Sequence, residues 1–256
     1  VCTAGDYPPL THFSKEGGFR GLAPQVIQNF ASSRNLSIDF VLTPWAELQN
    51  YLETKCVLAA GGITWTEERA KQFIASVPIE ADRKIPVFAS RNAPLFQDFK
   101  DFNQPDVIIV ENHGGTNEKY ARTLFEKGLM TKPSLEIIPT NQGAYACLRE
   151  CGARPLVMFT DSIEVDFVSG QPGSILSDLG ARIAMPDLPA FESEKVYLAR
   201  NSSEGRALMQ ELNRFLLEIK ADGRYQLWKR NAFSAKYPSP AAGCPLKPRC
   251  QGGSDV

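Results

Sequence analysis

Two residues that follow a short apolar run have the side chains needed to hold a carboxylate. The run 57–60 leads into Gly61-Gly62, and then come Thr64 and, five residues later, Arg69. A guanidinium group can donate two parallel hydrogen bonds to a carboxylate, and a threonine hydroxyl can add a third. The pattern favours an anion-binding pair. The alternative is an arginine on the surface of the helix that follows.

A glycine turn offers a second place for an anion. Gly114-Gly115-Thr116 lies between the apolar run 107–110 and a predicted helix that extends to Lys127. The first N–H groups of a helix have no partner within it, so such a turn suits a negatively charged group. The alternative is a plain tight turn with Thr116 as the N-cap, and both can hold at once.

Two acidic residues, Asp161 and Glu164, follow the apolar run 156–159. Taken alone, Asp161 can cap the next helix, and Glu164 can be a first-turn residue favoured by the helix dipole. From the residues alone this capping account is the stronger one. A catalytic role needs further support.

The elements that must position these residues alternate between helix and strand, which is typical of an α/β sheet. Strands are predicted at the N-terminus and at 37–42, 57–60, 107–110, 135–139, 156–159 and 196–199. Helices are predicted at 21–35, around 45–52, from 116 to 127, at 142–149 and in an amphipathic stretch that ends near 228. A second structural unit is expected to begin near Pro86.

Composition excludes several classes of function. The 256 residues carry 28 basic and 29 acidic side chains, so the total charge does not favour a nucleic-acid partner. No apolar run approaches the roughly 18–20 residues of a membrane span. Two histidines and the absence of a Cys-x-x-Cys pair argue against zinc.

Six cysteines are an even number, which favours disulfides and an oxidising compartment. Six cysteines allow 15 pairings. Local spacing favours Cys244–Cys250 and, less strongly, Cys147–Cys151, which leaves Cys2–Cys56 as the third pair.

Three groups of motifs resemble the family 3 extracellular solute-binding proteins and, within them, the cyclohexadienyl dehydratases. The first is Cys2-Thr-Ala-Gly-Asp-Tyr-Pro-Pro9 with Gly17-Gly-Phe-Arg-Gly21, and the second is Gly62-Ile-Thr-Trp-Thr-Glu-Glu-Arg69 with Ser76-Val-Pro78. The third is Gly114-Gly-Thr-Asn-Glu-Lys-Tyr-Ala-Arg122, followed by Thr160-Asp-Ser-Ile-Glu164 and Glu194-Lys-Val-Tyr-Leu198. Their order and spacing are specific, and they span roughly residues 1 to 230.

The resemblance implies a two-lobed α/β fold of the periplasmic binding protein type II class, with a central cleft and two hinge crossings. Lobe one would be residues 1–87 and 188–256, including a tail from about residue 234, and lobe two would be 88–187. A small carboxylate ligand would bind in the cleft, and the protein would be periplasmic or secreted.

The resemblance also assigns roles to individual residues. The position matching Glu164 is the general acid of the dehydratases, and the position matching Asp161 pairs with the ligand ammonium in amino-acid binders. The other implied ligand-binding residues are Asp6, Trp45, Thr64, Arg69, Asn112, Gly115 and Thr116.

Two functions are therefore expected. One is a dehydratase that converts prephenate to phenylpyruvate, or arogenate to phenylalanine, by loss of carbon dioxide and water, and this reaction needs neither a metal nor an organic cofactor. The alternative is a receptor without catalytic activity for an amino acid or another small carboxylate.

Overall fold

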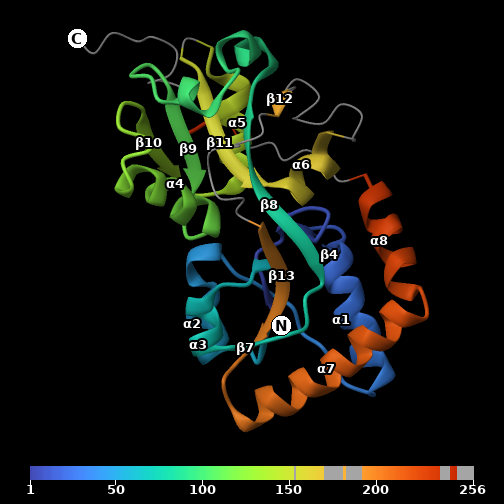
Figure 1. Cartoon of the computed structure of the whole chain (residues 1–256). Helices are drawn as coiled ribbons and strands as arrows, with labels where there is room; N and C mark the ends of the chain where they lie inside the picture. The colour runs from blue at the N-terminus through green and yellow to red at the C-terminus, as the bar shows by residue number, and fades with distance from the viewer. Residues whose placement is uncertain (153, 170–180, 183–191, 237–242, 247–256) are drawn as a thin grey trace. The chain divides into compact units, whose positions relative to one another are not determined.

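The computed structural model describes residues 1–152, 154–169, 181–182, 192–236 and 243–246. The chain divides into two compact units (Figure 1). Unit 1 comprises Val1–Asp82 and Ser193–Tyr237, and unit 2 comprises Arg83–Glu192 and Pro238–Val256. The chain therefore passes between the units three times: within strand β8 (Glu80–Phe88), at the start of β13 (Glu192–Ala199), and between residues 237 and 238.

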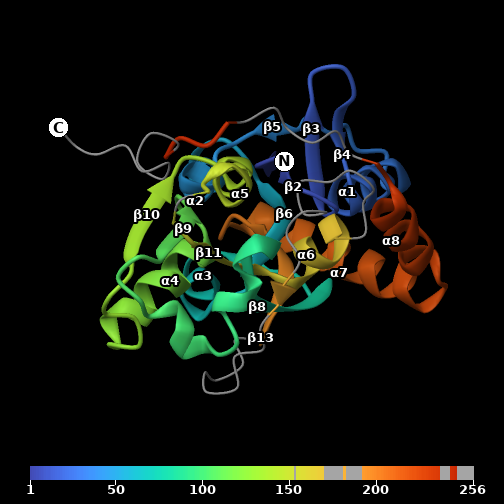
Figure 2. The same ribbon diagram turned by 90° about the horizontal axis from the view of Figure 1, so that it is seen from above.

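Unit 1 is built on a mixed sheet in the order β5-β1-β6-β13, with β7 paired to β13. Its strands are β1 (Cys2–Thr3), β5 (Val41–Leu42), β6 (Leu58–Thr64) and β7 (Ile74–Ala75), and β13 runs antiparallel to β6. Its helices are α1 (Leu22–Ser33), the 3-10 turn η1 (Trp45–Glu47), α2 (Leu48–Thr54), α3 (Glu67–Gln72), α7 (Ser203–Ala221) and α8 (Arg224–Ser234). A small antiparallel sheet of β2 (Asp6–Tyr7), β3 (Thr11–Ser14) and β4 (Gly18–Arg20) completes the unit, and its β3–β4 hairpin is prominent in Figure 2.

Strand β6 is longer than the predicted strand 57–60, because it continues through Gly61 and Gly62. Both glycines have positive φ, at 106° and 85°. A Cβ at Gly61 would lie 2.6 Å from the hydroxyl oxygen of Thr3, and one at Gly62 would lie 2.7 Å from the ring of Tyr7. Glycine is therefore required here by backbone conformation and by close packing, and the strand can extend as far as Thr64.

Unit 2 contains a sheet in the order β10-β9-β11-β8, with β12 (Ala181–Arg182) paired to β8. The strands β9 (Ile108–Asn112), β10 (Ser134–Ile138) and β11 (Leu156–Asp161) are parallel, and β8 is antiparallel to β11. The helices are α4 (Thr116–Glu126), α5 (Asn141–Glu150) and α6 (Ser162–Ser169), and two 3-10 segments, η2 (Ser90–Leu95) and η3 (Phe99–Phe102), follow β8. Figures 1 and 2 show α4 and α5 on opposite faces of the sheet.

The packing of unit 2 follows from alternation along its strands. Ile108 and Val110 point into a core with α5, whereas Ile109 points into a second core with α4 and the aromatic residues of η3. A parallel sheet covered on both faces needs apolar side chains on both faces, which explains the nearly continuous apolar runs in the sequence.

The disulfides correct two of the three predicted pairs. Cys2–Cys56 is present as predicted. Cys147 pairs with Cys244, however, so the predicted Cys147–Cys151 and Cys244–Cys250 pairs are wrong. Cys151 also belongs to a disulfide, and Cys250 lies outside the described residues. Cys147 lies in the helix at 141–150, and Cys151 follows the end of this helix. The spacing of the cysteines did not show that residues near Cys244 pack against the same helix.

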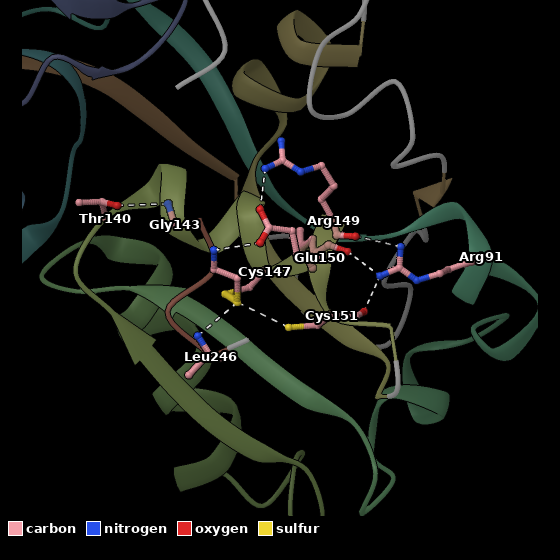
Figure 3. The surroundings of a disulfide bond; sticks show 10 residues. Arg91, Thr140, Gly143, Cys147, Arg149, Glu150, Cys151 and Leu246 are labelled. Carbon is pink, nitrogen blue, oxygen red and sulfur yellow. Dashed lines mark hydrogen bonds and ion pairs between the residues drawn. A yellow bond between two sulfur atoms is a disulfide. The ribbon is translucent and has the colours of Figure 1, made fainter. Parts of the chain in front are cut away.

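The C-terminal segment therefore belongs to unit 2, not to lobe one as predicted. Leu246 enters the same core as α5. The Cys244 backbone N–H donates to Glu150 at 3.4 Å. Arg91 donates to the carbonyls of Leu148 and Cys151 at the other side of the helix end (Figure 3). Helix α5 is thus fixed at its C-terminal end by a covalent bond and by hydrogen bonds.

The long C-terminal helix of unit 1 also differs from the prediction. The amphipathic stretch that ends near residue 228 is two helices, α7 and α8, which are separated at Gly223 with φ of 85°. Within the described residues, no helix is both long enough and apolar enough to cross a bilayer.

Candidate functional site

Polar side chains in unit 2 gather where its strands end and its helices begin. The strands β9, β10 and β11 are parallel, so their carboxyl ends lie at one edge of the sheet, and α4, α5 and α6 each start just after one of them. Ligands of open α/β sheets commonly bind at this edge. We call the following residues the unit 2 cluster: Lys84, Thr116, Asn117, Asn141, Thr160, Asp161 and Glu164.

A buried lysine forms one half of the cluster. The Nζ of Lys84 donates to Asp161 Oδ1 at 2.6 Å, to Thr116 Oγ1 at 3.0 Å and to Asn117 Oδ1. Lys84 and Asp161 are opposite each other in the antiparallel pairing of β8 and β11, which explains their contact. The side chain of Lys84 is 0% exposed and that of Asp161 is 4% exposed. This is an ion pair sheltered from water, with further hydrogen bonds to the ammonium group.

The predicted general acid forms the other half. Glu164 lies in the first turn of α6 and is 1% exposed. Its Oε1 accepts a hydrogen bond from Asn141 Nδ2 at 2.5 Å, and its Oε2 accepts one from Thr160 Oγ1 at 2.9 Å. Asn117 Nδ2 donates to Thr160 Oγ1 at 3.3 Å. Asn117 also accepts from the lysine ammonium, so the two halves form one continuous hydrogen-bonded network.

Two further ionisable groups lie beside this network. Burial, together with the nearby Glu164 carboxyl, raises the pKa of the Tyr145 phenol well above its usual value. Burial likewise raises the pKa of the Glu111 carboxyl well above its usual value, although the backbone N–H of Phe159 donates to it at 2.7 Å and Lys84 opposes the shift. Burial disfavours charged forms, so this environment keeps both groups neutral.

The glycine turn lies directly before α4, and the alternative that Thr116 is the N-cap is wrong, because Thr116 is the first residue of the helix. Gly115 is the N-cap of α4, and no side chain caps the helix at that position. Glu118 accepts the Gly114 N–H at 2.8 Å and pairs with Arg122, which holds the turn in place. Asn112 is buried at the end of β9, and its amide lies against Gly115, where a Cβ would come within 3.3 Å.

In unit 1, Thr64 and Arg69 are in contact. Arg69 Nη1 donates to the Thr64 carbonyl at 2.7 Å, and Arg69 is buried to 9% exposure. The Thr64 hydroxyl accepts a hydrogen bond from Lys195 Nζ at 2.8 Å, and that ammonium lies 3.1 Å from Asp82 Oδ2. Two cationic side chains are thus held beside Thr64.

Asp6 and Trp45 form a second pair in unit 1. Trp45 Nε1 donates to Asp6 Oδ1 at 2.8 Å, and both residues are half-buried. Burial raises the pKa of the Asp6 carboxyl from 3.8 to about 6, and the hydrogen bond from Trp45 opposes this shift. Asp6 is therefore close to half protonated in mildly acidic solution.

The described residues contain one grouping with metal-ligand side chains, the sulfurs of Cys147, Cys151 and Cys244, which lie within 4.8 Å of one another. All three belong to disulfides. Metals bind thiolates, so these sulfurs do not make a metal site in this state.

Of the residues implied by the resemblance, five lie together in or beside the unit 2 cluster: Asn112, Gly115, Thr116, Asp161 and Glu164. In unit 1, Thr64 contacts Arg69 and Asp6 contacts Trp45. Whether these residues bind a ligand stays a prediction. Sequence reasoning missed Lys84, Asn117, Asn141 and Lys195. The two lysines lie among other charged residues at the start of their strands, EADRKIPVF and ESEKVYLA, so the sequence carried no distinct signal for them.

The chain matches the family described as bacterial extracellular solute-binding proteins, family 3, over residues 1–235. It is 29% identical over 199 residues to the cyclohexadienyl dehydratase of Pseudomonas aeruginosa, which covers 77% of this chain and 69% of that protein.

Solved structures support the same fold. An ancestral amino-acid-binding protein, described as a precursor of cyclohexadienyl dehydratase, has a TM-score of 0.77 at 22% identity, over 91% of this chain and 94% of its own. An amino acid transporter substrate-binding protein of Streptococcus pneumoniae, solved with L-arginine bound, has a TM-score of 0.75 at 16% identity, over 91% of this chain and 93% of its own. The predicted fold class is confirmed, and the chain belongs to the family 3 bacterial extracellular solute-binding proteins, with a type II periplasmic binding protein fold.

Proposed function

We propose that this protein is a cyclohexadienyl dehydratase that acts outside the cytoplasm, in the periplasm or after secretion, and converts prephenate to phenylpyruvate or arogenate to phenylalanine. The observation that carries the proposal is the environment of Glu164: a carboxyl that is almost completely buried at the start of α6 and held by Asn141 and Thr160. The relative from Pseudomonas aeruginosa supports the same reaction.

The reaction needs one proton in the right place. The bond between the ring carbon and its carboxylate breaks, and its electron pair forms a ring double bond while carbon dioxide leaves. The ring hydroxyl departs at the same time, and protonation makes it leave as water. Hydroxide is a poor leaving group, so a positioned acid is the main catalytic requirement.

Glu164 fits this role when it carries a proton. The carboxyl is 1% exposed, so bulk water does not compete with the substrate for its proton. Asn141 fixes one carboxyl oxygen, and Thr160 can donate to the other while that oxygen directs its proton toward the substrate. A carboxyl whose orientation is fixed by two hydrogen bonds does not have to reorganise during the reaction.

Carboxylate binding is assigned to other residues. Arg69 is held by the Thr64 carbonyl in a defined position and carries a guanidinium suited to a carboxylate. The backbone at the N-terminus of α4, around Gly115 and Thr116, suits a second carboxylate. Neither role requires a metal or an organic cofactor.

The test is the substitution Glu164→Gln, which keeps the shape and the hydrogen-bonding capacity but cannot deliver a proton. We expect prephenate to bind the variant about as tightly as wild type, while kcat falls by roughly 10²–10⁴-fold, the usual contribution of a general acid. Binding is measured by calorimetry, and turnover is followed by the absorbance of phenylpyruvate in alkali.

The matched control is Asp166→Asn, which removes an exposed carboxylate two residues further along α6 and should leave kcat unchanged. If Glu164→Gln keeps full turnover, another group supplies the proton. If wild-type protein binds prephenate without any turnover, the protein is a receptor without catalytic activity, as in the amino-acid-binding relatives.

A further inference from the structure

The ion pair between Lys84 and Asp161 places an ammonium group of the protein itself within the unit 2 cluster. An alkylammonium group has three N–H donors, and three acceptors surround this one: Asp161 Oδ1, Thr116 Oγ1 and Asn117 Oδ1. All four residues are buried or nearly so. The ammonium is therefore held in one position by the strand and helix ends around it.

This arrangement changes what the cluster can recognise. A carboxylate attracts a ligand ammonium only if its charge is not already compensated. The charge of Asp161 is compensated by Lys84 at 2.6 Å, and a second ammonium placed there would be repelled by the first. A ligand group without positive charge meets no such repulsion.

We infer that Lys84 determines ligand specificity: its ammonium occupies the position on Asp161 that a ligand amino group would take, so the site selects 2-oxo acids over the corresponding 2-amino acids. The inference rests on the proposed function only in assigning the ligand to the unit 2 cluster. For the dehydratase reaction it favours prephenate over arogenate, which differ at this carbon.

A purely structural ion pair makes a different prediction. If Lys84 served only to stabilise the fold, its removal would lower stability and would weaken binding of all ligands alike. A role in specificity changes the ratio of two affinities instead.

The experiment compares phenylpyruvate and L-phenylalanine, which differ only in the oxo or ammonium group at the second carbon. Their Kd values are measured by calorimetry for wild type, for Lys84→Met, and for Lys84→Met combined with Asp161→Asn. Melting temperatures are recorded for each protein, so that changes in folding are seen separately.

Wild type is expected to bind phenylpyruvate more tightly than L-phenylalanine. Lys84→Met exposes an uncompensated Asp161, so the affinity ratio should move toward L-phenylalanine by about 30-fold or more, the lower end of the effect of one partner in a buried charge pair. The double variant removes the carboxylate too, and the gain for L-phenylalanine should disappear.

If Lys84→Met does not fold, Asp161→Asn alone is the second test. It leaves the lysine charge in place and should move the ratio further toward phenylpyruvate. The inference is overturned if wild type binds L-phenylalanine as tightly as phenylpyruvate, if neither compound binds, or if folded variants leave the ratio unchanged. Because these measurements need no turnover, a preference for the oxo acid without prephenate turnover would overturn the dehydratase proposal alone. Turnover without the preference would overturn only the role of Lys84.

Discussion

Replacing Asp6 with asparagine should stabilise the protein, and the gain should depend on pH. The Asp6 carboxyl has a pKa of about 6 in the folded protein and 3.8 as its ordinary value, because burial disfavours its charge. Folding therefore favours the protonated form. The folded state holds the Asp6 proton more tightly than the unfolded state, so stability is lost as pH rises from about 3.8 to about 6 and then stays constant.

The size of this effect follows from the two pKa values. They differ by about 2.2, and each pKa unit corresponds to about 1.4 kcal/mol, so ionised Asp6 costs about 3 kcal/mol above pH 7. Asparagine is neutral at every pH, and its side-chain oxygen can still accept the Trp45 N–H that now bonds to Oδ1 at 2.8 Å. We expect Asp6→Asn to raise the free energy of unfolding by about 1–3 kcal/mol at pH 8 and by almost nothing at pH 3.

Urea unfolding of wild type and variant at pH 3, 5, 6 and 8 measures this difference directly. Trp45→Phe is a useful comparison, because it removes the hydrogen bond that lowers the Asp6 pKa and should move the pH dependence upward. If the free energies of unfolding of Asp6→Asn and wild type differ by the same amount at all four pH values, the reasoning is refuted. A variant that is less stable than wild type at pH 8 would also refute it.

Two other changes test features around the unit 2 cluster. Changing both Cys147 and Cys244 to alanine removes one bond between positions 97 residues apart and should lower the free energy of unfolding by at most about 2–4 kcal/mol in urea titrations. Dithiothreitol should then destabilise the variant less than wild type. Glu111→Gln should have nearly the same melting-temperature difference from wild type at all pH values below about 4.5, where Glu111 is protonated in the folded and the unfolded protein. Above pH 4.5 the melting temperature of the variant should rise relative to wild type, because the unfolded chain then releases the Glu111 proton while burial keeps it on the folded protein. A melting-temperature difference between Glu111→Gln and wild type that is constant from pH 4 to 7 would contradict this account.

The α/β fold could be predicted because its signals are local. The apolar runs at 107–110, 135–139 and 156–159 became β9, β10 and β11 within one or two residues at each end. Strands β9 and β11 are buried along their whole length, so no polar alternation blurs their limits. The predicted strand at 57–60 ended too early, because the pair Gly61-Gly62 is typical of a turn. Their role depends on Thr3 and Tyr7, which pack against them from elsewhere in the chain.

The candidate site was harder to predict from the sequence, because its contacts join residues that are far apart in the chain. Asp161 was identified from the motif that it shares with amino-acid binders, yet the residue that neutralises it, Lys84, is 77 positions away and comes together with it only through the pairing of β8 with β11. The cysteine pairing failed likewise: nearness along the chain favoured Cys147–Cys151, whereas the fold brings Cys244 to Cys147.

The Cys147–Cys244 bond has a consequence for a chain that has been cut. Any single break in the peptide backbone between these two residues leaves both fragments joined through sulfur. Strand β13 and the helices α7 and α8 all lie within that interval, so this part of unit 1 stays attached to the rest even after a protease has acted there. A nicked molecule would keep its full mass on a gel without reductant and would separate into two bands only when thiol is added. A cut in this interval would thus not release either fragment while the disulfide stays intact.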